Sequence, residues 1–260
     1  MLVLLSLFPI YFVLTNSFKT PVAFGQSTLN LPAHPDLSNY LAAWAQVGLP
    51  ILRTLLIVLV SVLGILLTAS LSAYAFAWLR FPGRQALFTL VFVLLLVPAF
   101  LTLIPLYLQI KAFGLSNQPL GLILPYIASG QAFSVLVLKT FFEQVPSELL
   151  EASRLDGAND AQVIRHVVLP LSLPVLVSVG IINLVPLWND LLLPQLVLNR
   201  SSETATMALV EFQALAQSST STNFGALMAG YVLASIPLIL IFSFLMRYYV
   251  EGLSSGAVKA

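Results

Sequence analysis

The sequence predicts an all-α integral membrane protein with six transmembrane helices in one domain over residues 1–260. Of these 260 residues 59% are hydrophobic and only 8% are charged, whereas roughly 25% of residues are charged in ordinary soluble domains. The mean hydropathy is +0.98. The apolar residues form runs near or above the roughly 20 residues that cross about 30 Å of hydrocarbon. These six runs are residues 1–14, 50–78, 85–108, 120–142, 171–198 and 224–246.

The first run is almost wholly apolar and barely long enough to span. It has no basic segment before it and no clear small-residue cleavage site, so we interpret it as a first transmembrane helix rather than a signal peptide. A polar segment follows, and we expect it to form an external loop over about residues 18–49 with a short helix start at residues 39–41. The prolines of this segment are Pro21, Pro32 and Pro35.

The next three runs contain a few polar or helix-breaking residues. Arg53 lies near the start of the second, and we interpret it as an arginine whose head group snorkels to the interface. Pro98 and Pro105 interrupt the third run. The fourth contains Gln131 and ends near Lys139. All three runs remain apolar enough to be interpreted as transmembrane helices.

Between the fourth and fifth runs lies a polar segment, residues 143–168, which we call the polar hairpin. It carries seven of the 21 charges in the sequence. Ser147 can cap a helix with an acidic residue in its first turn, and Gly157 ends that helix, because glycine adopts the left-handed conformation without a Cβ penalty. Asn159 and Gln162 have the spacing of a capping box for a second helix. The pattern predicts a helix, a glycine turn and a second helix in water beside a membrane.

The fifth run holds the clearest candidates for a substrate path. A charge near the bilayer centre costs about 2.5–3.5 kcal/mol on insertion scales, so Asp190 is expected to be functional or paired. It follows Pro186, which removes a helical hydrogen bond. Trp188 and Asn189 beside it supply an aromatic face for stacking and polar groups for hydrogen bonds. Equally, Asp190 can pair with a neighbouring subunit or helix end, and Trp188 can anchor at the interface.

Three further polar residues are weaker candidates for this path. Each of them can instead form a hydrogen bond between helices. They are Gln131, Asn183 and Gln195.

Basic residues predict the orientation of the six spans. One set of loop ends holds Arg80, Arg84, Lys139, Arg154, Arg165, Arg247 and Lys259. The other set holds Lys19, Arg53, Lys111 and Arg200. Because cytoplasmic loops are richer in lysine and arginine, we expect the polar hairpin and both termini to be cytoplasmic. Residues 18–49 and 199–223 are then external loops.

Several function classes find no support in the residues. The chain has no cysteine, and its two histidines, His34 and His166, are far apart in sequence, so a metal centre is not expected. There is no GxxxxGK[ST] motif for ATP and no GxSxG motif. A net charge of +1 gives no reason to expect nucleic acid. We expect a chain that is not an enzyme and has no cofactor of its own.

The polar hairpin resembles the EAA loop of ABC importer permeases, in which Glu-Ala-small is followed by Gly and then by Leu-Pro. Here these are Glu151-Ala152-Ser153, Gly157-Ala158 and Leu169-Pro170. The fuller string, from Pro146 to Pro174, is most similar to the carbohydrate-importer branch, the maltose-permease type. The resemblance extends to Ala73-Tyr74-Ala75, residues 81–84, Gly114-Leu115 with Asn117, Glu251-Gly252-Leu253 and residues 256–259. At two places the chain departs from it: the family usually has a basic segment before the first span, and Asn-Ser where Arg53-Thr54 stand here.

The resemblance implies the type I fold of ABC importer permeases and the function of a transmembrane subunit that forms half of the path of an ATP-driven sugar importer. It implies coupling to a separate ATPase subunit through the helix over residues 148–157. The ATPase-coupling residues would be Glu148, Glu151, Ala152, Ser153, Arg154, Asp156, Gly157 and Ala158. The implied partners are a second homologous permease, two subunits that hold ATP and Mg²⁺, and an extracytoplasmic solute-binding protein, in a bacterial or archaeal cytoplasmic membrane.

Other functions are weighed against this one. An ion-coupled secondary transporter needs midplane ionisable groups or broken helices in two repeated halves, but only Asp190 qualifies and no internal repeat is visible. A membrane enzyme needs a convergent set of His, Asp or Glu, and the acidic residues of the polar hairpin are explained by helix and turn positions. The same ABC architecture could also carry a polyol or glycerol 3-phosphate, which the residues do not distinguish from a sugar.

Overall fold

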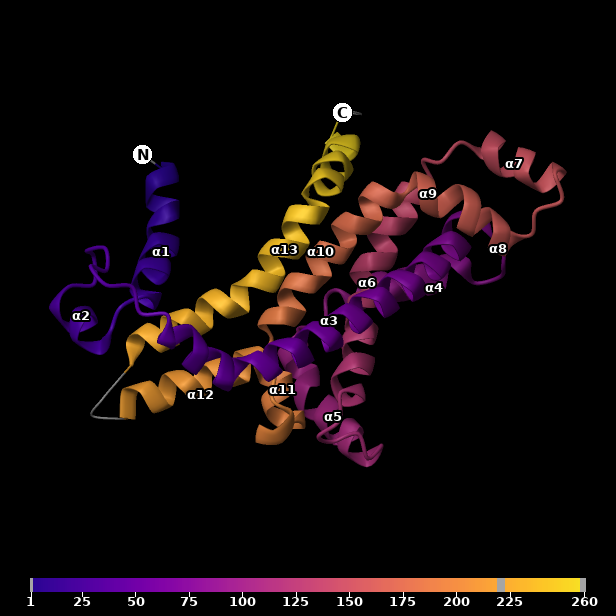
Figure 1. The fold of residues 1–260 in the computed structure, drawn as a ribbon. Helices are drawn as coiled ribbons and strands as arrows, with labels where there is room; N and C mark the ends of the chain where they lie inside the picture. The colour runs from indigo at the N-terminus through magenta and orange to yellow at the C-terminus, as the bar shows by residue number, and fades with distance from the viewer. Residues whose placement is uncertain (1, 219–222, 258–260) are drawn as a thin grey trace. The chain divides into compact units, whose positions relative to one another are not determined.

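The computed structural model describes residues 2–218 and 223–257, and every regular element in them is helical (Figure 1). By their contacts the residues fall into two compact units. The first comprises Met1–Leu56 and Trp188–Ile241, and the second comprises Ile57–Leu187 and Phe242–Ala260. Three long helices contribute residues to both units: α3 (Ser38–Trp78), α10 (Leu173–Asn189) and α13 (Phe224–Ala257).

The first unit contains α1 (Leu2–Ser17), α2 (Pro21–Gln26), α11 (Leu192–Val197), a 3₁₀ turn η2 (Arg200–Ser202) and α12 (Ala205–Ser218) beside its parts of the long helices. Asn39 is fully buried at the start of α3 and joins three segments. Its Nδ2 donates to the carbonyls of Ser17 and Lys19 at 3.0 and 2.9 Å, and its Oδ1 accepts from Asn223 at 3.0 Å. A Cβ at Gly225 would overlap the Lys19 carbonyl, so only glycine allows α13 to begin there.

The second unit contains α4 (Arg84–Leu94), α5 (Ala99–Ala112), α6 (Leu120–Phe142), α7 (Ser147–Leu155), α8 (Asp160–Val163), a π-helical turn η1 (Ile164–Val168) and α9 (Leu169–Leu171) beside its parts of the long helices. A close helix crossing forms at Gly130 of α6. A Cβ there would lie 2.5 Å from Ile65 of α3 and 2.8 Å from Asn183 of α10. Small residues at such crossings let helices approach closely without the help of a hydrophobic effect.

The described residues contain three helices that are long and apolar enough to cross a membrane: Ser38–Trp78, Leu120–Phe142 and Phe224–Met246. The number rises to five if each of two bent pairs counts as one span. Arg84–Leu94 with Ala99–Ala112 is bent by 99°, and Asp160–Leu171 with Leu173–Asn189 is bent by 80°. The apolar helix Leu5–Ser17 is shorter. The chain is thus an all-helical membrane protein with three to five candidate spans, and the count of six stays a prediction.

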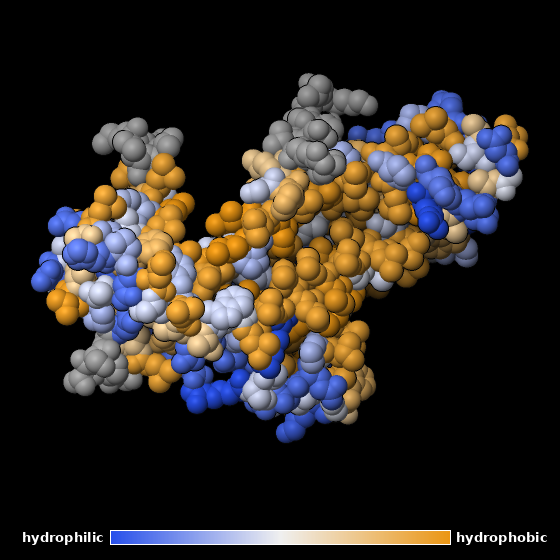
Figure 2. All heavy atoms as spheres, in the orientation of Figure 1, coloured by the Kyte–Doolittle hydropathy of each residue, from blue (hydrophilic) through white to orange (hydrophobic). Residues whose placement is uncertain are grey.

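The surface of the α3 helix within the second unit supports this assignment. Leu63, Leu67 and Leu71 repeat at every fourth residue and are 65%, 64% and 51% exposed. An apolar stripe of this kind on a helix that buries its opposite face is suited to lipid rather than water. Figure 2 shows apolar residues over much of the visible surface, whereas polar residues gather at α7, around α2 and near α11 and α5.

Several predicted boundaries differ from the structure. The helix that contains the predicted second span begins at Ser38, not at residue 50, and α3 passes through Pro50. The predicted external loops 18–49 and 199–223 contain helices, α2 in the first and the 14-residue α12 in the second. In the second loop serine and threonine are concentrated at the ends, and the Ala- and Leu-containing stretch between them favours a helix.

The spans with prolines also differ from their predicted form. The third run forms two helices, α4 and α5, and the chain turns between them. Pro98 lies in this turn, and a proline disfavours the helical conformation of the residue before it. The fifth run is bent at Ser172, whereas Pro186 lies inside a continuous α10 and does not interrupt it. Residues 258–260 of the predicted family-like tail lie outside the described residues.

Candidate functional site

The polar hairpin has the local geometry that its sequence predicts, with one exception. Gly157 has φ +86°, and the N–H groups of Gly157 and Ala158 donate back to the carbonyls of Arg154 and Ser153, both at 3.0 Å. This is the Schellman ending of a helix. The capping box at Asn159 is confirmed, with reciprocal bonds of 3.0 and 2.9 Å to Gln162.

The exception is the start of α7. Ser147 is the first helical residue, Pro146 is in the N-cap position, and no side chain caps the helix. The predicted cap by Ser147 is therefore wrong. Proline and the residue after it begin α7 one position earlier than a serine cap would, and Glu148 still lies in the first turn, where the helix dipole favours a carboxylate.

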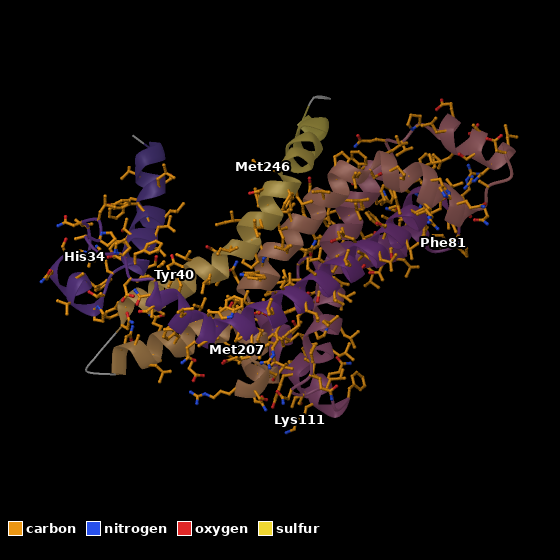
Figure 3. All side chains as sticks on the ribbon, viewed as in Figure 1. His34, Tyr40, Phe81, Lys111, Met207 and Met246 are labelled. Atoms are coloured by element: carbon orange, nitrogen blue, oxygen red, sulfur yellow. The ribbon has the colours of Figure 1, made fainter. Side chains whose placement is uncertain are left out.

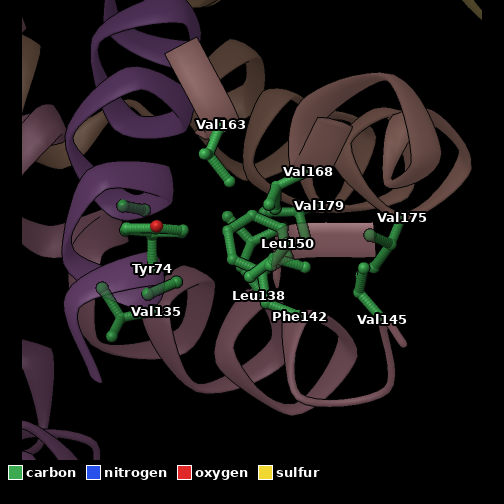
Figure 4. Close-up of a cluster of buried hydrophobic side chains, with 12 residues drawn as sticks. Tyr74, Val135, Leu138, Phe142, Val145, Leu150, Val163, Val168, Val175 and Val179 are labelled. Carbon is green, nitrogen blue, oxygen red and sulfur yellow. The ribbon is translucent and has the colours of Figure 1, made fainter. Parts of the chain in front are cut away.

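An apolar contact attaches α7 to the other helices of the second unit. Leu150 is 2% exposed and belongs to a buried cluster drawn in Figure 4. The cluster includes Tyr74, Leu138, Phe142, Val145, Val163 and Val168. These residues come from α3, α6, α8 and η1 and from the segment before α7. Because Leu150 is the only fully buried residue of α7, this short helix depends on one side chain for its apolar attachment.

A polar contact links the two halves of the hairpin to α3. The hydroxyl of Tyr74, a residue 1% exposed, donates to Asp160 Oδ1 at 2.9 Å. Arg154 Nη2 donates to the same oxygen at 3.0 Å and to the Tyr74 hydroxyl at 3.4 Å. The hydrogen bond to Asp160, and then that to Tyr74, raises the pKa of Arg154 above its ordinary value, so the guanidinium stays charged.

Much of the hairpin is exposed to solvent. Most of the predicted coupling residues are exposed, and only Ser153 and Ala158 are half-buried. The exposed ones are Glu148, Glu151, Ala152, Arg154, Asp156 and Gly157. Leu155 is 89% exposed among them. A surface with acidic residues and an exposed leucine is suited to contact with another protein.

A cavity of about 530 Å³ lies between the end of α3 and the first two turns of α7. Its lining residues are Trp78, Leu79, Arg80, Ser147, Leu150, Glu151 and Arg154. Leu150 and Arg154, which belong to the apolar and polar contacts described above, both lie at the edge of this cavity. One of the two histidines, His34, is exposed in the segment between α2 and α3 (Figure 3).

The candidate path residues are divided between the two units. In the first unit Trp188 and Asn189 line a pocket of about 290 Å³, which we call the Trp188 pocket. Its other lining residues are Ala205, Thr206, Leu209, Val210, Tyr231, Ala234, Ser235 and Leu238. Trp188 is 4% exposed, and its carbonyl accepts from Thr206 Oγ1 at 3.1 Å. The pocket combines two aromatic rings with amide and hydroxyl groups.

Asp190 and Gln195 do not line this pocket. Asp190 Oδ1 accepts from the N–H of Leu192 at 3.1 Å, at the beginning of α11, a contact of the helix-end kind that the alternative interpretation assigns to it. In the second unit Gln131 donates to the Ile127 carbonyl at 2.9 Å, and Asn183 donates to Ser134 Oγ at 3.0 Å. The first bond lies within α6, and the second joins α10 to α6.

Sequence reasoning missed several residues of these sites. Thr206, Tyr231 and Ser235 complete the Trp188 pocket, and no local motif marks them. Tyr74 was part of a family-like string, but its bond to Asp160 joins residues 86 apart. In the described ranges, no group of three or more His, Asp or Glu residues could hold a metal ion.

Comparison with known proteins gives consistent matches. A family described as "Binding-protein-dependent transport system inner membrane component" matches residues 62–255. The diacetylchitobiose uptake system permease protein NgcG of Streptomyces coelicolor is 32% identical over 96% of this chain and 83% of its own. The trehalose transport system permease protein SugB of Mycobacterium tuberculosis is 31% identical over 98% of this chain and 93% of its own.

One solved structure has a similar fold over nearly the whole chain. It is a chain in the crystal structure of a bacterial ABC transporter involved in the import of the acidic polysaccharide alginate. The TM-score is 0.80 at 22% identity, and the match covers 95% of this chain and 92% of that one. At this identity the likeness shows the fold alone.

Proposed function

The chain belongs to the family of inner membrane components of binding-protein-dependent transport systems, and from this premise we propose that it forms half of the translocation path of an ATP-driven sugar importer. Family membership makes it a multi-pass, non-catalytic permease subunit of an ABC importer in the inner, or cytoplasmic, membrane. The family is one of permeases without cofactors. It also implies an ATPase and a solute-binding protein as partners.

The sugar assignment is carried by the full-length similarity to permeases named for diacetylchitobiose and trehalose. The Trp188 pocket supports it. Aromatic faces and hydrogen-bonding groups, as supplied by Trp188, Tyr231, Asn189 and Thr206, suit the apolar faces and hydroxyls of a sugar ring. The proposed path also includes Asp190, Gln131, Asn183 and Gln195.

For the polar hairpin we propose contact with the ATPase. The exposed side of α7 and the turn after it, from Glu148 to Ala158, would lie against the ATPase and transmit its closure to the spans. The observation that supports this is the combination of a rigid glycine turn with an exposed acidic surface. ATP and Mg²⁺ would be held entirely by the partner subunits.

The proposed topology has six spans. α1 would be the first, and each bent pair would be one span, which adds one to the five candidates of the described residues. The polar hairpin and both termini would be cytoplasmic, and residues 18–49 and 199–223 external, in a bacterial or archaeal membrane. A second homologous permease and two ATP-binding subunits would complete the membrane complex.

Uptake by the reconstituted complex tests the proposal. The complex with its binding protein in proteoliposomes would be offered labelled diacetylchitobiose, trehalose, maltose, a polyol and glycerol 3-phosphate, with and without ATP. ATP-dependent uptake of a sugar supports the proposal. ATP-dependent uptake of only the polyol or only glycerol 3-phosphate would replace the sugar by that compound as the proposed substrate. Uptake driven by an ion gradient without ATP would overturn it.

A further inference from the structure

Tyr74 is a polar residue in an unusual position. It lies on α3, four residues before the end of this long apolar helix, and its side chain is 1% exposed. Its hydroxyl points at the first residue of α8, where it donates to Asp160 Oδ1 at 2.9 Å. Burial of a hydroxyl in an apolar cluster is unfavourable unless the group finds a partner. The Asp160 carboxylate supplies that partner.

Asp160 Oδ1 serves two elements at once. It accepts from Tyr74 of α3 and from Arg154 of α7, and Arg154 also reaches the Tyr74 hydroxyl. The three side chains thus join α3, α7 and α8 at a single oxygen. Hydrogen bonds to ionised groups are short and directional, so this contact restricts rotation in a way that the apolar contact of Leu150 cannot.

The hairpin itself is built as one body. The Schellman ending at Gly157 and the capping box at Asn159 satisfy the backbone on both sides of the turn. The bond from Arg154 of α7 to Asp160 of α8, at 3.0 Å, joins the two helices across that turn. Their attachment to the end of α3 includes the Leu150 cluster and the Tyr74 contact, and a cavity of about 530 Å³ also lies between α7 and that end.

We propose that Tyr74, Asp160 and Arg154 form a clamp that makes the polar hairpin and the end of α3 move as one body. In this inference Tyr74 is a positioning residue of the transport cycle. It rests on the proposed function insofar as the hairpin receives motion from the ATPase. The clamp passes that motion to α3, a membrane-spanning helix, and loss of the hydroxyl allows the hairpin to move without it.

A distance measurement tests the clamp directly. The chain contains no cysteine, so Leu155→Cys on α7 and Leu71→Cys on α3 provide two unique sites for spin labels in a complex with cysteine-free partners. Both side chains are exposed, at 89% and 51%. We expect a narrow distance distribution that keeps its width between the nucleotide-free and the ATP–vanadate states. Tyr74→Phe should broaden it about twofold or more.

Matched variants separate the clamp from a general loss of packing. Tyr40→Phe removes a tyrosine hydroxyl that bonds Ser17 Oγ at 2.7 Å in the first unit, and it should leave the distribution unchanged. Asp160→Ala removes the accepting oxygen and should broaden it, and Tyr74→Phe with Asp160→Ala should broaden it no further than the more severe single variant. An unchanged width in both Tyr74→Phe and Asp160→Ala would overturn the inference.

Uptake of labelled trehalose or diacetylchitobiose per ATP hydrolysed gives the functional result. Tyr74→Phe should lower this ratio about threefold or more, while the half-saturating concentration of binding protein stays unchanged. Gly157→Val distinguishes a failure of the clamp from a failure of the proposed contact between the polar hairpin and the ATPase. If Gly157→Val uncouples the complex and Tyr74→Phe does not, the clamp is wrong and the coupling assignment stands. If neither variant changes the ratio, the coupling assignment itself fails, and the clamp loses its role with it.

Discussion

The polar hairpin and the Trp188 pocket are built in opposite ways. The hairpin is formed by one continuous stretch whose turn and second helix are defined by bonds between residues at most five positions apart. The pocket is assembled from α10, α12 and α13, with Trp188 and Tyr231 from well-separated parts of the chain. The hairpin should therefore respond sharply to single local changes, whereas the pocket should respond in a graded way.

The largest effect is expected from Gly157→Val. At φ +86° a β-branched residue is strained by about 1–3 kcal/mol, and the turn would rearrange. We expect the protein to reach the membrane and assemble, but uptake per ATP hydrolysed should fall about tenfold or more.

Gly114→Val is the matched control for this change. Gly114 has φ +70° in the same unit, and at both glycines an added Cβ has nothing within 4 Å. The strain is thus similar, but the position is outside the hairpin. Equal uncoupling by both variants, or normal uptake with Gly157→Val, would contradict the coupling role of the hairpin.

A second large effect is expected from Leu150→Ala. Large-to-small changes at buried leucines cost about 2–5 kcal/mol, and here the loss falls on the single buried side chain of α7. Hydrogen exchange of the amides in α7 should accelerate strongly while that of α6 is unchanged. Leu155→Ala is the control, because Leu155 is 89% exposed and its truncation should leave exchange in α7 unaltered.

The contrast between the two regions also explains what the sequence could predict. The turn at Gly157 and the capping box at Asn159 were predicted because their signals are local. Ser147 was assigned as a cap because serine favours that position, but Pro146 takes it. The helix start predicted at residues 39–41 agrees with the start of α3 at Ser38. The continuation of this helix through Pro50 and the helix α12 were missed, because proline and Ser/Thr content are weaker influences than the packing of the surrounding segments, such as Thr54 Oγ1 accepting from the N–H of Ala205 at 2.8 Å.

The Trp188 pocket lay beyond sequence reasoning for a related reason. Trp188 and Asn189 were chosen as polar and aromatic residues in an apolar run, and both line the pocket. Asp190, the strongest candidate by charge, contacts the start of α11 instead. In a helical bundle, the neighbours of a residue depend on the rotation of its helix and on contacts between distant segments. A local sequence motif predicts neither.

A graded effect is expected from Asp190→Ala. The variant loses a hydrogen bond at the start of α11, which typically contributes about 1 kcal/mol to stability. Uptake should fall several-fold, while the subunits still purify together. Asp190→Asn keeps an oxygen that can accept from Leu192 and should retain most of the uptake. If Asp190→Ala abolishes assembly instead, the residue is structural and does not belong to the path.

The smallest effect is expected at Glu203, in the segment between η2 and α12 that we propose to be external. Burial raises the pKa of this carboxyl above its ordinary value of 4.5, and the nearby charges of Arg200 and Arg53 oppose that shift only in part. Because the folded protein binds the proton more tightly than the unfolded chain, this group stabilises the fold fully below the ordinary pKa, and the contribution is lost as the pH rises through the raised value. Glu203→Gln should therefore raise the unfolding temperature slightly at pH 7 and not at pH 4. A lower unfolding temperature at pH 7 would show that the carboxylate is instead stabilised by its arginine neighbours.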